Sequence, residues 1–399
     1  MPSVTENKPG MKVLISGSVL QLFFGIIYVW SVFVMPVSET YEWEVGGVKL
    51  MTSFMLCFFV AGILGGGKML IKIGAEKTVL AGGLMLAAGM LATGFLPLAA
   101  ARLMYVTYGV IGGFGVGAVY SAVITAVQKS FPQNRGFATG VAVCAFGFST
   151  VIFAPLVETL IVQFTVRNTF LILAAGFAVV VLSLYRFIRL PDASAQTGAA
   201  ALLEKRQYTT AETIRTKEFY LITCSMMLAT AAFFILNPSI KTLAAGRGLE
   251  ASAGTIIVMM TGIANAFGRL GAPMLSDKIG REKAAMTIIL TTAAGSLLLC
   301  FAEGFWFMAA IAAIAFCFGG FSGVYPVLTA DYFGIKNVGS NYGAVMVGFA
   351  LSALAFPILF ATVGSDTVKF VILSVFAVVG AVMMGVLAVL KTSAKKNVE

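Results

Sequence analysis

Residues 72–77 read Lys-Ile-Gly-Ala-Glu-Lys, and the same pattern returns at residues 278–283 as Lys-Ile-Gly-Arg-Glu-Lys. The two copies lie 206 residues apart, and each stands between two long apolar runs. A Gly-Gly-Phe triplet at residues 112–114 also returns, at nearly the same spacing, at residues 319–321. Self-similarity at one long spacing predicts two halves built on the same plan.

The apolar runs around these copies predict membrane-spanning helices. The chain has 399 residues, of which 59% are hydrophobic and 11% charged, whereas a soluble domain carries about 25% charged residues. A helix needs about 20 apolar residues to cross a hydrocarbon core. We therefore predict an all-α membrane protein of twelve transmembrane helices in two pseudo-symmetric six-helix halves. The predicted spans lie near residues 12–37, 48–70, 78–98, 102–127, 136–160, 167–188, 219–242, 252–275, 284–302, 305–329, 338–363 and 367–390.

The distribution of basic residues predicts the orientation of these spans. With the N-terminus in the cytoplasm, 20 of the 27 basic residues fall on the cytoplasmic side and only six outside. Cytoplasmic loops carry such an excess of Lys and Arg in membrane proteins. The net charge of +10 therefore indicates topology rather than nucleic-acid binding. We expect a multi-pass protein of the inner (plasma) membrane, with both termini cytoplasmic and no removable signal peptide.

A polar segment separates the two predicted halves. Residues 189–218 form the longest polar stretch and predict a cytoplasmic linker between an N-terminal half, residues 1–188, and a C-terminal half, residues 219–399. Two parallel six-helix repeats place a substrate site at their interface, near the middle of the membrane.

Composition also limits the chemistry of the chain. Its five cysteines stand singly in apolar runs and it has no histidine, so we expect no metal and no cofactor. The predicted spans contain no polar catalytic cluster or nucleophile–base pair, which argues against an enzyme. A membrane-embedded sensor is the other alternative, but no signalling domain is attached. The sequence indicates no obligate protein partner, only the lipid bilayer.

Arg269 is the one basic residue that lies well inside a predicted span, away from its ends. The next charge, Asp277, comes eight residues later, which puts Arg269 ~12 Å inside the hydrocarbon layer. Burying an arginine there costs at least about 2.5 kcal/mol, so a functional role is the first hypothesis. The planar guanidinium suits bidentate binding of a carboxylate. Asn265, one turn earlier, shares the face of Arg269 and could bind the same ligand.

A structural ion pair is the alternative role for Arg269. It would need a buried acid, but all 17 acidic residues lie in loops or near helix ends, Glu158 being the nearest exception.

Two tyrosines lie at a similar depth. Tyr120 precedes Lys129 by nine residues and Tyr325 precedes Asp331 by six, which places both ~9–14 Å inside. A buried hydroxyl needs a partner, so these residues are candidate ligand contacts, with hydrogen-bonded packing as the alternative. Tyr28 and Asn237 are weaker candidates of the same kind.

Several motifs resemble known families. The stretch Asp-Lys-Ile-Gly-Arg-Glu-Lys at residues 277–283 resembles the loop signature of the major facilitator superfamily. Residues 28–33, 115–120, 131–136 and 325–334 together resemble the oxalate:formate antiporter family, which is related to the proton-linked monocarboxylate transporters.

The resemblance implies an organic-anion carrier and assigns roles to residues. Arg269 matches the family's substrate arginine in the eighth helix. The resemblance implies a gating role for five residues: Asp277, Lys278, Gly280 and Arg281 in the loop signature, and Arg135 in the motif at residues 131–136. The first-half copy of the signature departs from the pattern, with Ile71 where an aspartate is expected.

One departure concerns the substrate. Oxalate carriers of this family have a lysine in the eleventh helix after Asn-Tyr-Gly, and Phe349 stands at that position here. A second carboxylate would be left unpaired at a cost of several kcal/mol. We therefore predict a monocarboxylate such as lactate, pyruvate, acetate or formate, with Phe349, Phe321 and Phe146 as an apolar wall. An oxalate or other dicarboxylate:formate antiporter is the alternative.

The mode of coupling stays open between proton symport and anion exchange. Proton-linked relatives have an aspartate one turn before the arginine, where this chain has Asn265. In symport, the substrate acid or Glu158 would have to bring the proton.

Overall fold

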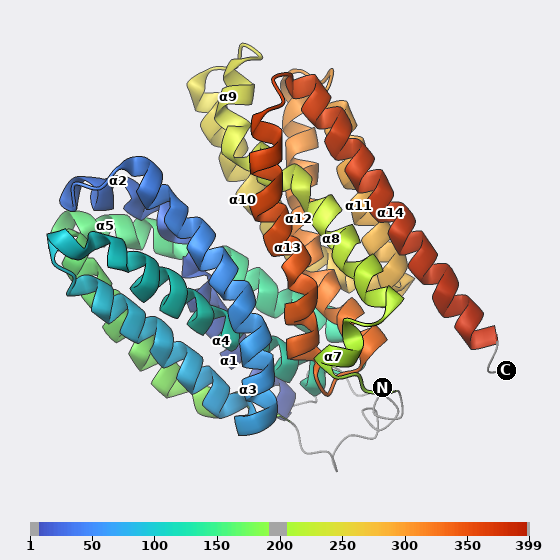
Figure 1. Cartoon of the computed structure of the whole chain (residues 1–399), viewed down its shortest axis with the longest axis horizontal. Coiled ribbons are helices and arrows are strands. Elements are labelled where there is room, and N and C mark those ends of the chain that lie inside the picture. The colour runs from blue at the N-terminus through green and yellow to red at the C-terminus, as the bar shows by residue number, and fades with distance from the viewer. Residues whose placement is uncertain (1–7, 191–205, 397–399) are drawn as a thin grey trace. The chain divides into compact units, whose positions relative to one another are not determined.

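The computed structural model describes residues 8–190 and 206–396. Half of the predicted linker, residues 189–218, falls on residues 191–205, which lie outside the described ranges. Within those ranges the chain is helical and contains no strand (Figure 1).

Thirteen α-helices and five shorter helical stretches make up the described chain. The α-helices are α1 (Lys8–Phe24), α2 (Trp30–Thr40), α3 (Val45–Gly94), α4 (Gly113–Ser130), α5 (Arg135–Leu184), α7 (Thr210–Thr213), α8 (Lys217–Leu236), α9 (Ile240–Ala245), α10 (Ala251–Ile279), α11 (Arg281–Leu298), α12 (Gly304–Phe333), α13 (Val338–Ala361) and α14 (Asp366–Lys396). The shorter stretches are the 3₁₀ turns η2 (Gly25–Val29), η3 (Leu98–Leu103), η5 (Tyr185–Phe187) and η7 (Asn237–Ser239), and the π-helix η4 (Tyr105–Gly112).

These elements account for the twelve predicted spans. Nine helices among the described residues are long and apolar enough to cross a membrane. Two of the nine, α3 and α5 with η5, are 50 and 53 residues long, and a helix of 50 residues measures about 75 Å against a core of about 30 Å. Each contains one residue with non-helical dihedral angles, so each supplies two spans. With α11 as a further span, the prediction of an all-helical membrane protein is confirmed.

The repeated Lys-Ile-Gly sequence forms the same backbone corner in both copies. Gly74 has φ 81° and ψ 170°, and Gly280 has φ 95° and ψ 154°. Only glycine adopts this region of dihedral space without strain, and a Cβ at either position would meet no other atom. The dihedral angle alone therefore requires glycine at these corners, which explains why the motif repeats.

The chain forms two compact units. The first comprises residues 1–210 and 333–344, and the second comprises residues 211–332 and 345–399. The helix α13 begins in the first unit and continues in the second. The prediction of two six-helix halves with a linker between them stays a prediction.

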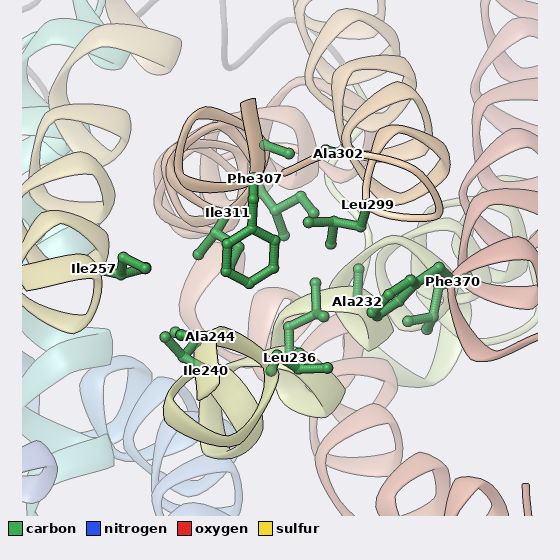
Figure 2. Packing of buried hydrophobic residues seen from close by; sticks show 14 of the residues in the cluster. Ala232, Leu236, Ile240, Ala244, Ile257, Leu299, Ala302, Phe307, Ile311 and Phe370 are labelled. Carbon is green, nitrogen blue, oxygen red and sulfur yellow. The ribbon is translucent and has the colours of Figure 1, made fainter. Parts of the chain in front are cut away.

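A cluster of buried apolar side chains stabilises one end of the second unit (Figure 2). Arg247 lies beside this cluster, with its guanidinium 4.4 Å from the centre of the Phe307 ring. Its N–H groups donate to the carbonyls of Leu243, Leu299 and Ala302 at 2.8–3.3 Å. A cation is favoured at carbonyls that end helices. Arg247 is therefore a structural residue that joins α9 to the end of α11.

The corner inside α5 is strained, which gives a test of the backbone argument. Thr165 has φ 74° and ψ 162°, the region that Gly74 and Gly280 occupy, although threonine is β-branched. Its side chain is exposed. We expect Thr165→Gly to raise the free energy of unfolding by about 0.5–2 kcal/mol, because strain of about 1–3 kcal/mol is relieved and glycine costs about 0.5–1 kcal/mol in entropy.

Thermal unfolding of the purified protein in detergent measures this effect. Thr165→Ala is the matched control, since alanine keeps a Cβ and therefore keeps the strain. An unchanged midpoint for Thr165→Gly would contradict the assignment of strain.

Candidate functional site

Arg269 lies on α10 in the second unit and is 3% exposed. Its Nε donates a hydrogen bond to Oδ1 of Asn265 at 2.9 Å, so the predicted adjacency of the two side chains is confirmed. The amide of Asn265 is neutral. This hydrogen bond therefore orients the guanidinium without neutralising its charge.

The helix α12 contacts α10 directly behind these residues. A Cβ at Gly319 would lie 2.0 Å from the carbonyl oxygen of Asn265 and 3.0 Å from the backbone nitrogen of Arg269. No side chain fits in that space, so the two backbones touch at this point. The contact fixes the backbone position of Arg269 within the second unit.

Tyr325 lies on α12, is fully buried, and hydrogen bonds to α8. The hydroxyl of Ser225 donates to the carbonyl of Ile222 at 2.8 Å, so across the 3.0 Å contact the Tyr325 hydroxyl donates to Ser225. Phe321, one turn earlier, packs edge-on against Tyr325 at 5.9 Å. In this arrangement Tyr325 can offer a ligand only its oxygen lone pairs. Its role as a ligand contact stays a prediction.

Phe349 lies on α13 in a cluster of four phenylalanine rings. Its centroid is 5.9 Å from that of Phe318 and 5.1 Å from that of Phe234. Phe318 in turn stacks on Phe233 at 3.8 Å, with 14° between the ring planes. The position that the resemblance associates with lysine is therefore surrounded by apolar rings in this chain. Sequence reasoning missed the other three phenylalanines.

A second aromatic cluster lies in the first unit and joins three of the predicted residues. The Phe146 ring lies 5.7 Å from Tyr28 and 5.3 Å from Tyr120. Phe59 of α3 completes the cluster, at 5.4 Å from Tyr120 and 5.9 Å from Phe146. Residues from η2, α3, α4 and α5 therefore meet here. Phe59 could not be singled out, since it stands in an apolar run without a distinguishing neighbour.

The predicted loop residues Asp277 and Arg281 form a buried polar cluster. Arg281 contacts Oδ1 of Asp277 at 2.5 Å and Oδ2 of Asp331 at 3.3 Å, and it donates to the hydroxyl of Ser276 at 2.5 Å. The side chains of the three charged residues are only 10–16% exposed. The cluster ties the end of α10 and the start of α11 to α12. Asp331 was not predicted as a partner.

Each repeated corner is followed by an ion pair that involves a glutamate. In the second unit Glu282 accepts a hydrogen bond from Tyr332 at 2.9 Å and pairs with Lys391. In the first unit Glu76 pairs with Arg189. The two acids are 206 residues apart and the two bases 202, so these pairs belong to the repeat. Extending the repeat spacing to the chain ends would have revealed them from the sequence.

The remaining predicted residues lie outside these clusters. Asn237 is exposed in η7, Glu158 is exposed on α5, Lys278 is exposed at the end of α10, Gly280 forms the corner described above, and Arg135 is buried as the first residue of α5. Among the described residues, no three acidic, cysteine or histidine side chains lie together as a metal site.

The fold and these clusters define an all-helical membrane protein with a buried arginine and two aromatic clusters. The sequence matches the Major Facilitator Superfamily over residues 15–286 and 222–399. The chain belongs to this superfamily.

Curated relatives and a solved structure agree with this assignment. The chain is 26% identical to the uncharacterized MFS-type transporter YhjX of Escherichia coli, over 86% of this chain and 85% of that one. It is 25% identical to the oxalate:formate antiporter of Oxalobacter formigenes, over 80% and 76%. It is 23% identical to monocarboxylate transporter 13 of Rattus norvegicus, over 90% and 84%.

A crystal structure of the superfamily transporter FucP shares the fold. It matches with a TM-score of 0.73 at 13% identity, over 95% of this chain and 99% of that one.

The Arg281 cluster yields a stability prediction. Arg281→Ala removes the cation that contacts the buried carboxylates of Asp277 and Asp331, so we expect a loss of about 2–4 kcal/mol in the free energy of unfolding. Adding Asp331→Asn should restore part of that loss, because one of the two buried carboxylates that lose Arg281 becomes neutral.

Thermal unfolding of the single and double variants measures this coupling. Lys278→Ala is the control, since Lys278 is exposed beside the cluster. Equal losses in the single and double variants would show that the three charges do not act as one cluster.

Proposed function

We propose that this chain is a secondary-active carrier of small monocarboxylates, of the lactate, pyruvate, acetate and formate class. It works by alternating access, with proton-linked symport or anion exchange as its mode. The observation that carries the proposal is Arg269, a buried guanidinium oriented by Asn265 on a helix whose backbone is fixed by α12. A carboxylate is the ligand that a planar guanidinium binds best.

The preference for one carboxylate rests on the surroundings of Phe349. A dianion needs a second cation, and at this position the chain offers a phenyl ring among three others. A second carboxylate facing those rings loses its hydration without gaining a partner. A short hydrocarbon chain gains from the same contact, since burying apolar surface is favourable.

The relatives support the same substrate class. One is described as an oxalate:formate antiporter and another as monocarboxylate transporter 13, so both names specify carboxylates. Relatives and fold are those of transporters, which supports transport rather than enzymatic catalysis. We propose the inner membrane as its location, with both termini in the cytoplasm.

An oxalate or other dicarboxylate:formate exchanger is the second candidate, and the name of the Oxalobacter relative favours it. Uptake by proteoliposomes separates the two. Labelled lactate, pyruvate, acetate and formate should enter under a proton or counter-anion gradient, with oxalate a weak competitor. Strong competition by oxalate together with weak competition by lactate would favour the exchanger. No uptake of any monocarboxylate under either gradient would overturn the proposal.

Arg269 gives the first transport prediction. Arg269→Ala should reduce uptake to background, and Arg269→Lys should reduce it by about tenfold or more, because lysine keeps the charge and loses the bidentate fork. Arg215→Ala is the control, since Arg215 is exposed. Size-exclusion chromatography establishes that each variant is folded. Normal uptake by folded Arg269→Ala would remove Arg269 from the site.

Phe349 gives the second transport prediction. Phe349→Lys should lower the concentration of oxalate that half-inhibits uptake by about tenfold, which is about 1.4 kcal/mol of new interaction with the second carboxylate. Phe349→Met is the control, because it changes the shape of the side chain without adding charge. If lysine and methionine variants respond alike to oxalate, Phe349 does not set the charge preference. Thermal unfolding identifies a variant whose aromatic cluster is disrupted.

A further inference from the structure

Four exposed residues form a straight line along α11 and the turn that ends it. They are Lys283, Leu290, Leu297 and Phe301, all in the second unit. The steps between them are seven, seven and four residues, and the 18 residues together make five full helical turns. The four side chains therefore belong to one face of the helix.

The first unit has the same four residues on the span that follows its own glycine corner. Lys77, Leu84, Leu91 and Phe95 lie 206 positions before their counterparts, and all four are exposed. The two phenylalanines are among the most exposed apolar residues of the chain, Phe95 at 65% and its counterpart at 71%. We call each set of four a repeat stripe.

Buried residues of the same two spans do not repeat in this way. Leu86 corresponds to Thr292 and Met90 to Ser296 at the offset of 206, and none of these four is more than 1% exposed. Packing normally constrains buried positions more tightly than exposed ones, because an interior feels the change of even one methylene. The identity of the exposed residues therefore points to a constraint from outside the two spans.

The dimensions and chemistry of a repeat stripe match a cross-section of a bilayer. Eighteen residues at about 1.5 Å each span about 27 Å, close to the hydrocarbon thickness of about 30 Å. A lysine at one end can extend its ammonium group into the headgroups while its methylenes stay in the apolar layer. A phenyl ring at the other end suits the boundary between headgroups and acyl chains, and the two leucines between them suit the acyl chains.

The second unit adds two aromatic residues at the phenylalanine end of its stripe. Phe305 and Trp306, in the first turn of α12, are 69% and 63% exposed, with their ring centres 5.7 Å apart. Phe307, the next residue, is buried in the apolar cluster of the second unit (Figure 2). The cluster therefore fixes the backbone that presents both rings at the surface. An indole at this position is typical of the interface between membrane and water.

We propose that the two repeat stripes are lipid-contact faces that fix the depth of their spans in the bilayer, with the lysine in one headgroup region and the phenylalanine at the other. The occupant is lipid because the same stripe occurs in both units. A bilayer surrounds a membrane protein and offers the same layers to each unit, whereas a protein partner would select one surface. Phe305 and Trp306 reinforce the anchor of the second unit. This proposal does not depend on the identity of the substrate.

Tryptophan fluorescence in vesicles of brominated phosphatidylcholine tests the proposal, because bromine quenches only an indole that it can approach. The chain has three tryptophans. Trp30 is 1% and Trp43 is 9% exposed, so lipid reaches mainly Trp306, which is 63% exposed. Bromine attached near the headgroup should quench the parent protein more than bromine at the end of the acyl chain. Trp306→Phe should remove most of that quenching.

Single reporters in the Trp306→Phe protein then measure depth along each stripe. In the second unit, Lys283→Trp and Phe301→Trp should be quenched best by the shallow bromine. Leu290→Trp should be quenched best by the deep bromine, since this position lies about 10 Å and about 16 Å from the two ends. The ratio of shallow to deep quenching should change by about twofold or more between positions 290 and 301. Leu84→Trp and Phe95→Trp should repeat this contrast in the first unit.

The same ratio at the leucine and phenylalanine positions would overturn the proposal. So would reporters at positions 84 and 290 that neither lipid quenches, which is the result expected if a second copy of the chain covers the stripes. Thermal unfolding establishes that each reporter variant is folded. The two stripes are measured separately, so if a variant fails to fold in one unit, the other unit decides.

Discussion

The cost of keeping a cation among apolar helices determines how this molecule is organised. Three arginines in the second unit are each held by a different set of acceptors. Arg247 receives three backbone carbonyls at helix ends, and Arg281 receives the carboxylates of Asp277 and Asp331. Both sets tie helices together, which is a structural role. At Arg269 the Nε group donates to a neutral amide on its own helix. That bond orients the guanidinium and does not itself neutralise its charge.

The sequence predicted the features that depend on residues close together in the chain. The apolar runs gave the spans, and the repeated Lys-Ile-Gly gave two corners that adopt the same dihedral angles. The spacing of four residues gave the contact between Asn265 and Arg269. The sequence did not predict hydrogen-bond and ion-pair partners that come from distant segments. Asp331 lies 50 residues from Arg281, and Ser225 lies 100 residues from Tyr325, so no helical period connects them.

The aromatic clusters show a second limit of sequence reasoning. Phe349 was singled out because the resemblance gave that position a meaning. Phe233, Phe234 and Phe318 are chemically identical to it, but the chain has 33 phenylalanines and the sequence does not say which of them meet. Packing in three dimensions selects four of them. The charge preference proposed for the site therefore depends on all four phenylalanines. Phe349 is the only one of them that the sequence comparison singled out.

The two repeats keep the same corner and differ in what surrounds it. Each corner is followed by an ion pair, Glu76 with Arg189 in the first unit and Glu282 with Lys391 in the second. Only the second unit adds the Arg281 cluster, since the residue that matches Arg281 in the first unit is Ala75. In the first unit, residues 207–210 instead form hydrogen bonds between neutral groups with residues 333–341. Salt screens exposed ion pairs and affects neutral hydrogen bonds little. Ionic strength should therefore weaken the exposed Glu76–Arg189 pair more than these hydrogen bonds.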